Sequence, residues 1–156
     1  MSQDATFEEG GEAPLNLGAL DAEDLKVISA LVQDAVFVAA DMSWTPAGRR
    51  FAILLNRFRW EDKGGERHGP ERVRSLLVVD EVLRVASQGV PHRDADTILS
   101  LLSVDFEPGE DGTGHILLTL AGDGAIRLEV EALGVTLKDV TRPYRAPSGR
   151  TPSHSD

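Results

Sequence analysis

Three side chains that could bind a divalent metal ion lie close together in the sequence: His92, Asp94 and Asp96. An imidazole and two carboxylates form a suitable ligand set. They come from one short loop, and no second cluster of His, Asp or Glu with ligand spacing accompanies them. The alternative interpretation is a polar loop in which Asp94 or Asp96 caps a helical turn, which is a common role for aspartate.

Residues 109–114, Gly-Glu-Asp-Gly-Thr-Gly, have the glycine content of a phosphate-binding loop. A phosphate cradle needs a strand before it, a helix after it and usually a lysine. Here a strand pattern follows, and two acids stand where the phosphate would lie. The segment therefore predicts a turn between strands, in which glycine supplies positive φ values.

The most unusual segment is 51–60, FAILLNRFRW, whose second half alternates in character. In a strand, Arg57 and Arg59 share one face, while Asn56, Phe58 and Trp60 share the other. Arginine and aromatic residues are enriched at protein-binding hot spots, and they also hold single-stranded nucleic acid by charge and base stacking. The simpler interpretation is that Phe58 and Trp60 face the core while the two arginines face solvent.

Charge is unevenly distributed along the chain. Residues 49–74 contain eight Lys or Arg and four Asp or Glu, a local charge of +4 within a chain of net charge −10. A basic face on an acidic protein gives electrostatic complementarity to a partner, whereas the acidic remainder would repel a phosphate backbone. The candidate partner-binding residues are Arg49, Arg50, Arg57, Arg59, Trp60, Arg72 and Arg74.

Composition narrows the class of protein. The 156-residue chain has the size of one domain and contains no cysteine, which excludes disulfides, thiolate metal sites and cysteine nucleophiles. No apolar run reaches the length of a membrane span, and residues 1–12 lack the features of a signal peptide. We therefore expect a soluble protein, and the lack of cysteine favours a reducing compartment such as the cytoplasm. We expect no cofactor.

One segment, residues 20–36, predicts an amphipathic helix. Asp21 suits the N-cap, and Asp24 stands three residues later in the position of a capping-box partner. An apolar stripe at helical spacing is formed by Leu25, Ile28, Leu31, Val32 and Ala35.

Strand patterns occupy most of the remaining sequence, at residues 36–44, 51–60, 72–79, 82–87, 98–107, 115–120, 126–133 and 135–140. Residues 72–79 and 82–87 are either two strands or one strand bent at Asp80-Glu81, and 36–44 and 51–60 form a hairpin. Asp123-Gly124 predicts a type I′ turn, and short loops favour antiparallel neighbours. The expected fold is α+β and predominantly β: an N-terminal amphipathic helix followed by about eight mainly antiparallel strands in a sandwich or partly closed barrel. Residues 15–141 form this single domain, between disordered tails at residues 1–14 and 142–156.

Three stretches carry a family resemblance: LDAEDLKVISALVQDAV, FAILLNRFRWE and ILSLLSVDFEPGEDGTGHILLTLAGDGAIRLEVEALGVTLKDV. They resemble small alphaproteobacterial proteins catalogued as domain of unknown function 2948, and the likeness covers residues 15–140. The family carries no assigned activity. The resemblance therefore implies a bacterial cytoplasmic protein and supplies no functional residues. Residues 62–70 look longer and more polar than the link usual in the family.

The sequence thus predicts a non-enzymatic module that binds another protein, or itself, through a basic and aromatic surface around residues 49–74. No nucleophile elbow, zinc-protease motif or P-loop is present. The alternative is a small-ligand or metal-dependent enzyme with a site near residues 92–96. A further alternative is a single-stranded nucleic-acid binder that uses Arg57, Arg59 and Trp60.

Overall fold

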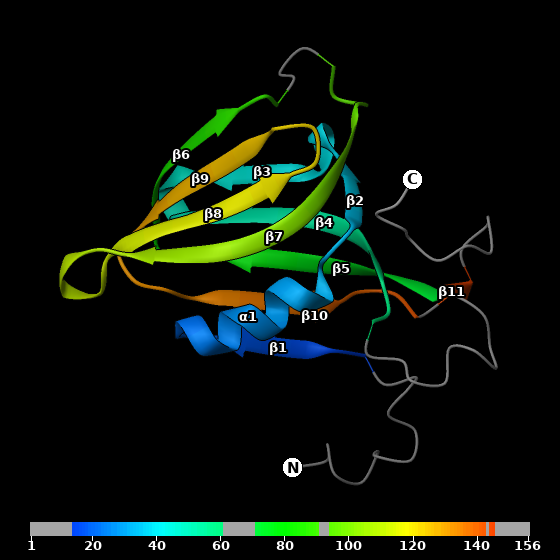
Figure 1. Cartoon of the computed structure of the whole chain (residues 1–156), viewed down its shortest axis with the longest axis horizontal. Coiled ribbons are helices and arrows are strands. Elements are labelled where there is room, and N and C mark those ends of the chain that lie inside the picture. The colour runs from blue at the N-terminus through cyan, green and yellow to red at the C-terminus, as the bar shows by residue number, and fades with distance from the viewer. Residues whose placement is uncertain (1–13, 61–70, 91–93, 143, 146–156) are drawn as a thin grey trace, which may run out of the picture.

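The computed structural model describes residues 14–60, 71–90, 94–142 and 144–145, and antiparallel strands make up most of it (Figure 1). Within these residues there is one α-helix, α1 (Ala22–Leu31). The strands are β1 (Asn16–Ala19), β2 (Ala35–Val38), β3 (Met42–Thr45), β4 (Arg50–Phe58), β5 (Glu71–Val79), β6 (Val82–Gln88), β7 (Ile98–Pro108), β8 (Gly114–Leu120), β9 (Ala125–Val130), β10 (Val135–Asp139) and β11 (Tyr144–Arg145). The short 3-10 helices are η2 (Ala39–Asp41), η3 (Pro46–Gly48) and η4 (Glu110–Gly112).

All of the described strands belong to one 11-stranded sheet, whose main path runs β1-β10-β5-β4-β2-β7-β8-β9-β6. β3 pairs with β4, and β11 pairs with β5, outside that path. The ladders are antiparallel, so the predicted β-rich, antiparallel fold is confirmed. The predicted number of strands, about eight, is too low. No ladder between described strands joins the β1 edge to the β6 edge, so the sheet is not closed.

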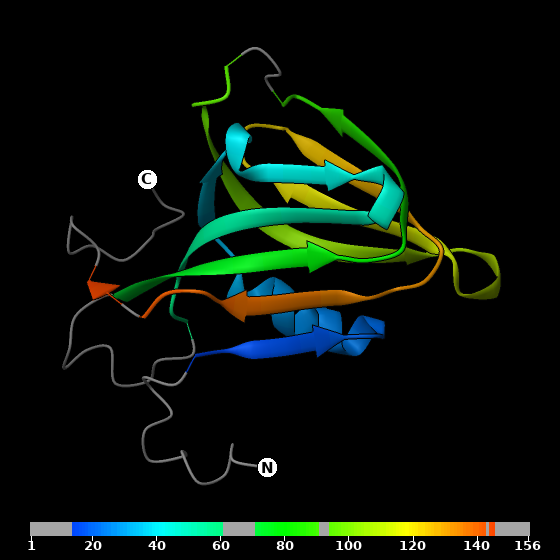
Figure 2. The same ribbon diagram turned by 180° about the vertical axis from the view of Figure 1, so that it is seen from behind.

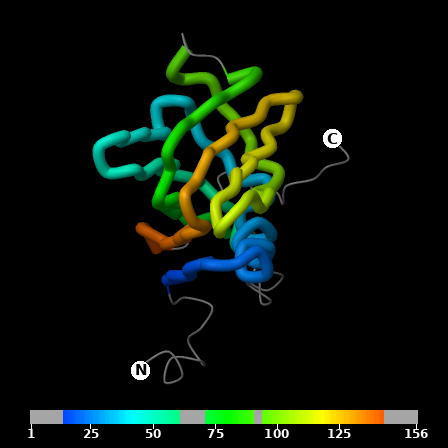
Figure 3. Tube along the Cα trace, turned by 90° about the vertical axis from the view of Figure 1, so that its left-hand side faces the viewer, coloured from blue at the N-terminus to red at the C-terminus, as the bar shows by residue number. Residues whose placement is uncertain are grey.

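The sheet nevertheless curls back on itself. β5 and β6 stand third and ninth along the path, yet only Asp80 and Glu81 separate them in sequence. Glu81 adopts a left-handed φ of 60°, which makes this tight turn possible. The backbone N–H of Val82 donates to the carbonyl of Arg49 at 2.9 Å, so β6 begins beside the start of β4. Figure 3 shows the curled sheet from its side, and Figure 2 shows the chain pass from β5 round into β6.

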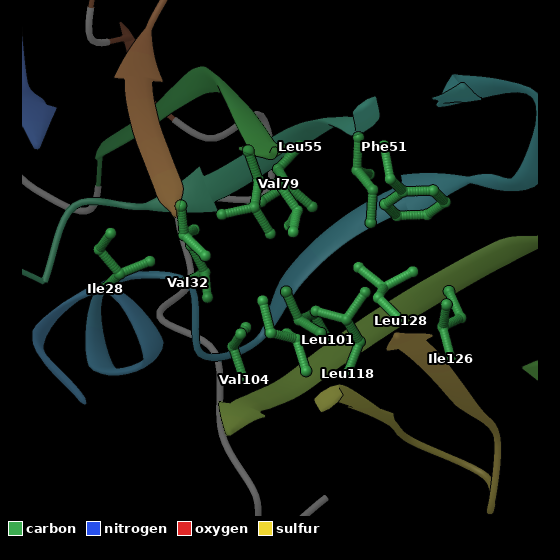
Figure 4. Close-up of a cluster of buried hydrophobic side chains, with 14 of the residues drawn as sticks. Ile28, Val32, Phe51, Leu55, Val79, Leu101, Val104, Leu118, Ile126 and Leu128 are labelled. Atoms are coloured by element: carbon green, nitrogen blue, oxygen red, sulfur yellow. The ribbon is translucent and has the colours of Figure 1, made fainter. Parts of the chain in front are cut away.

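The inner faces of the curled sheet enclose the hydrophobic core (Figure 4). Alternate residues of each strand point inward, as the period of two in a strand requires. On β9, for example, Ile126, Leu128 and Val130 are buried while Arg127 is exposed. This is the predicted alternation. Helix α1 adds Leu25 and Ile28 to the same core, followed by Val32 at its C-cap.

Helix α1 packs against β1 and β7. Asp21 is its N-cap, and the Asp21 carboxylate accepts from the N–H of Asp24 at 2.8 Å, as predicted. Ser29 Oγ accepts from the N–H of Val104 at 2.9 Å, which ties the helix to β7 beside a break in that strand's register. The helix is shorter than residues 20–36 and follows β1, so it does not precede all strands. No helix in the described part of the chain could span a membrane.

Other expectations need local correction. The predicted strand 36–44 is divided into β2 and β3 by η2, and β3 rather than β2 forms the hairpin with β4. In the β8–β9 turn the left-handed residues are Gly122 and Asp123, one position before the predicted pair. Tyr144 and Arg145, inside the predicted C-terminal disordered tail, form β11 on β5. Residues 1–13 and 146–156 of the two predicted tails lie outside the described residues.

Candidate functional site

Arg57 in β4 and Arg59, just after the end of β4, both lie inside the fold. Arg57 is 0% exposed and Arg59 4%, whereas Trp60 is 37% exposed. The prediction that Arg57 and Arg59 share one face and the aromatic residues the other is correct. The direction of those faces is wrong: the arginines point inward, and the aromatic side chains point outward. Neither arginine can therefore touch a partner in the folded protein.

Arg57 is neutralised by a buried acid from a distant strand. Its Nη2 lies 3.0 Å from Asp139 Oδ1 and 3.2 Å from Oδ2, and its Nε donates to Ser75 Oγ at 2.9 Å. Ser75 in turn donates to Asp139 Oδ1 at 2.6 Å. The N–H of Leu15 donates to Asp139 Oδ2 at 2.8 Å. Strands β4, β5 and β10 and the approach to β1 therefore meet at one charged cluster, which we call the inner cluster (Arg57, Ser75 and Asp139).

The inner cluster is a structural feature rather than a catalytic one. Ser75 is 0% exposed and Asp139 7%, so a substrate could not reach the hydroxyl without opening the sheet. The donors and acceptors satisfy one another, as buried charged groups require. Next to it, Arg59 pairs with Glu71 across the β4–β5 ladder, which neutralises the second inward arginine.

Arg49 and Arg50 lie at the opposite end of β4 and are also paired. Arg49 Nη1 contacts Glu131 and lies 3.6 Å from Glu81, and Arg50 Nε lies 2.9 Å from Asp80. The side chains of both arginines are at least half exposed, so these pairs contribute little to stability. The predicted basic residues therefore do not form one surface. Arg49 and Arg50 lie at one end of β4, and the others lie at the opposite end, on both faces of the sheet.

The remaining predicted residues meet on the outer face of β4 and β5, which faces the viewer in Figure 2. Asn56 lies opposite Arg74 in the ladder, and Phe58 lies opposite Arg72. The Phe58 and Trp60 rings are 4.9 Å apart, and the Arg72 guanidinium lies 6.0 Å from the Phe58 ring. We call these five residues the outer face (Asn56, Phe58, Trp60, Arg72 and Arg74).

Contacts within the outer face hold it in shape without neutralising its charge. Trp60 Nε1 donates to the carbonyl of Gln33 at 2.9 Å, and Arg72 Nη1 donates to the carbonyl of Asn56 at 3.4 Å. Neither Arg72 nor Arg74 forms an ion pair with a carboxylate in the described part of the chain. Among the residues that the structure describes, the face therefore presents positive charge without an acidic partner, beside an aromatic pair.

Exposed apolar side chains adjoin this charge. Val140 is 48% exposed, and its N–H donates to the carbonyl of Arg74 at 2.8 Å. Ile98 is 72% exposed and lines a groove of about 200 Å³ together with Asn56 and Arg74. Positive charge, aromatic rings and exposed aliphatic groups thus lie together on one side of the sheet, a combination typical of interaction surfaces.

The structure places Asp94 and Asp96 at the surface, in the approach to β7. Asp94 Oδ1 accepts from the N–H of Asp96 at 3.1 Å, and the Asp94 carbonyl accepts from the N–H of Thr97 at 3.2 Å. Asp94 therefore stabilises a turn. His92 lies outside the described residues. Within those residues no group of three or more His, Asp or Glu could hold a metal ion.

Sequence reasoning missed the inner cluster, although a signal for it exists. In each of three strands a polar residue takes an inward position in an otherwise apolar alternation: Arg57 after Ile53 and Leu55, Ser75 between Val73 and Leu77, and Asp139 after Val135 and Leu137. One acid, one base and one hydroxyl at such positions predict a buried ion pair. Reading the strands together would have shown that Arg57 faces inward.

Comparison with known proteins identifies the family of the chain but no activity. No curated protein and no solved structure is detectably similar to the chain. A family model described as a protein of unknown function (DUF2948) matches residues 15–154, which is most of the sequence and includes every strand of the sheet. The chain therefore belongs to the DUF2948 family, as its sequence resemblance indicated.

Proposed function

We propose that the protein is a non-enzymatic module that binds another protein through the outer face. The observation that carries this proposal is the pair Arg72 and Arg74, which stays without an acidic partner in the described structure while Arg49, Arg50, Arg57 and Arg59 are each paired. Charge of one sign attracts an oppositely charged partner and speeds its association. The aromatic side chains beside it supply an apolar contact that is buried on binding.

The chemistry of the outer face favours a partner segment with carboxylates beside an apolar side chain. Carboxylates would pair with Arg72 and Arg74, because a guanidinium binds a carboxylate through two parallel hydrogen bonds. The apolar group would pack on Phe58 and Trp60. Lys138, exposed on the adjacent strand β10, adds a further positive charge on this side of the sheet.

A different protein fits this face better than a second copy of the chain. In a two-fold symmetric dimer through the outer face, Arg72 and Arg74 would oppose the same arginines of the other copy. A contact between the outer face and an acidic surface elsewhere on the chain would be head-to-tail, and such contacts tend to extend into filaments. Nucleic acid is disfavoured because the net charge of the chain is −10. The lack of cysteine supports a cytoplasmic setting for the interaction.

The test is a site-specific crosslink followed by an affinity measurement. A photo-crosslinking amino acid replaces Phe58 on the outer face or, as the matched control, Leu83, which is 42% exposed on β6. We expect one protein to be captured in the native cells from position 58 and not from position 83. Capture of nucleic acid, of the chain itself, or of the same protein from both positions would contradict the proposal.

The purified partner then allows the charge requirement to be measured by titration calorimetry. The Arg72→Gln/Arg74→Gln variant is expected to weaken binding by at least about tenfold, because two carboxylate contacts are lost. The control variant Arg84→Gln/Arg127→Gln removes the same charge from exposed positions on β6 and β9 and should change the affinity by less than about twofold. Equal losses in both variants would refute a specific role for the outer face.

A further inference from the structure

A groove opens in the outer side of the sheet, between the part of β4 that pairs with β2 and the part that pairs with β3. β2 forms its single ladder pair with β4 between Val36 and Asn56 and then turns away into η2. β3 pairs with the same edge of β4 only over residues 50–53. Leu54, between these pairings, lines the resulting groove of about 200 Å³.

One end of the groove is polar. The side-chain oxygen of Asn56 there is buried and accepts no hydrogen bond from any residue that the structure describes. Arg74 lies directly across the ladder from Asn56 and also lines the groove. A buried acceptor favours a ligand that supplies an N–H. A guanidinium with no acidic partner in the described part of the chain favours one that supplies a carboxylate.

The opposite end repels a carboxylate. Asp41 lines the groove where η2 leads into β3, and its Oδ2 accepts from the N–H of Val38 at 3.4 Å. A bound anion is therefore expected at the Arg74 end, away from the Asp41 charge. The walls between the two ends are aliphatic and are formed by Val36, Val38, Leu54 and Ile98.

The volume of the groove limits its occupant. Sites for whole small-molecule ligands usually measure roughly 300–1,000 Å³, whereas this groove measures about 200 Å³. It is therefore better matched to a single aliphatic side chain than to a cofactor. The high exposure of Ile98, 72%, leaves part of the wall open for such a side chain to cover.

We propose that the groove binds the C-terminal residue of a partner protein. Such a residue carries an N–H, a carboxylate and a side chain on one Cα, which match Asn56, Arg74 and the aliphatic walls respectively. An internal peptide residue lacks the carboxylate at that carbon. This inference rests on the interaction proposed above and specifies the group of the partner that the outer face recognises.

Fluorescence anisotropy with dye-labelled peptides tests the inference on the full chain. One peptide pool has randomised internal positions, a C-terminal leucine and a free carboxylate, and a second pool is identical except for a C-terminal amide. We expect the free-acid pool to bind at least about tenfold more tightly, because the amide removes the charged contact to Arg74. That preference should disappear in Arg74→Gln and in Ile98→Asp, which places a like charge on the groove wall, and persist in Arg84→Gln.

Equal binding of the two pools would overturn the inference. So would competition by N-acetyl-leucine as effective as that by the peptides, because it would identify a site for small acyl amino acids. If the outer face captures a partner in cells while the pools bind equally, the interaction stands and only the terminal recognition fails. If no partner is captured and the free-acid preference is present, the interaction proposal fails and the groove chemistry stands.

Discussion

Removing the charge of Asp139 while keeping its shape is the most informative perturbation of this fold. In Asp139→Asn the Arg57 guanidinium, 0% exposed, loses the carboxylate that it contacts at 3.0 and 3.2 Å. The amide can still accept from the N–H of Leu15, so the strand pairing at β1 is kept. The variant therefore measures the effect of removing the Asp139 charge from the buried pair, with little change in packing.

Breaking a buried ion pair from one side costs about 3–5 kcal/mol of unfolding free energy. A domain of this size is stable by roughly 5–15 kcal/mol, so Asp139→Asn should remove a large share of the stability. Arg57→Met leaves the Asp139 charge buried instead and should cost a similar amount. The double variant buries neither charge, and hydrogen-bond losses near 1 kcal/mol each should leave it no less stable than either single variant.

Urea denaturation followed by circular dichroism measures these differences in a double-mutant cycle. We expect a coupling energy between Arg57 and Asp139 of at least about 3 kcal/mol. The matched control is the cycle of Arg50→Met and Asp80→Asn, an exposed pair at 2.9 Å, whose coupling should stay below about 1 kcal/mol. Additive losses at Arg57 and Asp139 would refute the inner cluster as an interacting pair. If a single variant does not fold, a folded double variant still establishes the coupling.

Three further changes in stability follow from local structure, each measured by the same denaturation. Asp21→Ala removes the N-cap hydrogen bond to Asp24 and should cost about 1 kcal/mol, whereas Asp21→Ser should recover most of it. Gly114→Ala places a Cβ 2.6 Å from the Phe106 ring and should cost about 1–3 kcal/mol by overpacking, and a stability equal to that of the parent would contradict the close approach. Leu118→Ala, at a 0% exposed core position, should cost about 2–5 kcal/mol, and a loss below about 1 kcal/mol would contradict its burial.

Local features of this fold are predictable because neighbouring residues determine them. The Asp21 cap depends on atoms three residues apart, and the alternation in β9 depends on a single solvated face. The order of strands in the sheet, by contrast, depends on residues that are far apart in the sequence. β1 pairs with β10, more than 100 residues later, and its four residues carry no repeated pattern long enough to identify them as a strand. Because the sequence does not predict β1, the helix is expected to be the first element of the domain, whereas it is the second.

The direction of the β4 faces is a long-range property as well. Both halves of the alternation begin with apolar residues, Phe51, Ile53 and Leu55 on one face and Ala52 and Leu54 on the other. The strand alone therefore allows either face to be buried. The inward face is the one whose arginine meets a buried acid, and that acid, Asp139, lies 82 residues away. A charged residue can occupy the core face only if another strand supplies its counter-charge.

The basic segment 49–74 is less basic in the folded protein than its summed charge suggests. The summed charge of a segment equals its charge at the surface only when no acidic residue from another part of the chain pairs with it. Here Asp80, Glu131, Glu71 and Asp139 each take one arginine of that segment, two of them inside the fold. The number of arginines therefore overstates the basic surface. Arg72 and Arg74 have no acidic partner among the described residues, and the residues opposite them on β4 are Phe58 and Asn56. The outer face, which we propose as the binding surface, differs from the inner cluster because its arginines have no acidic partner among the described residues.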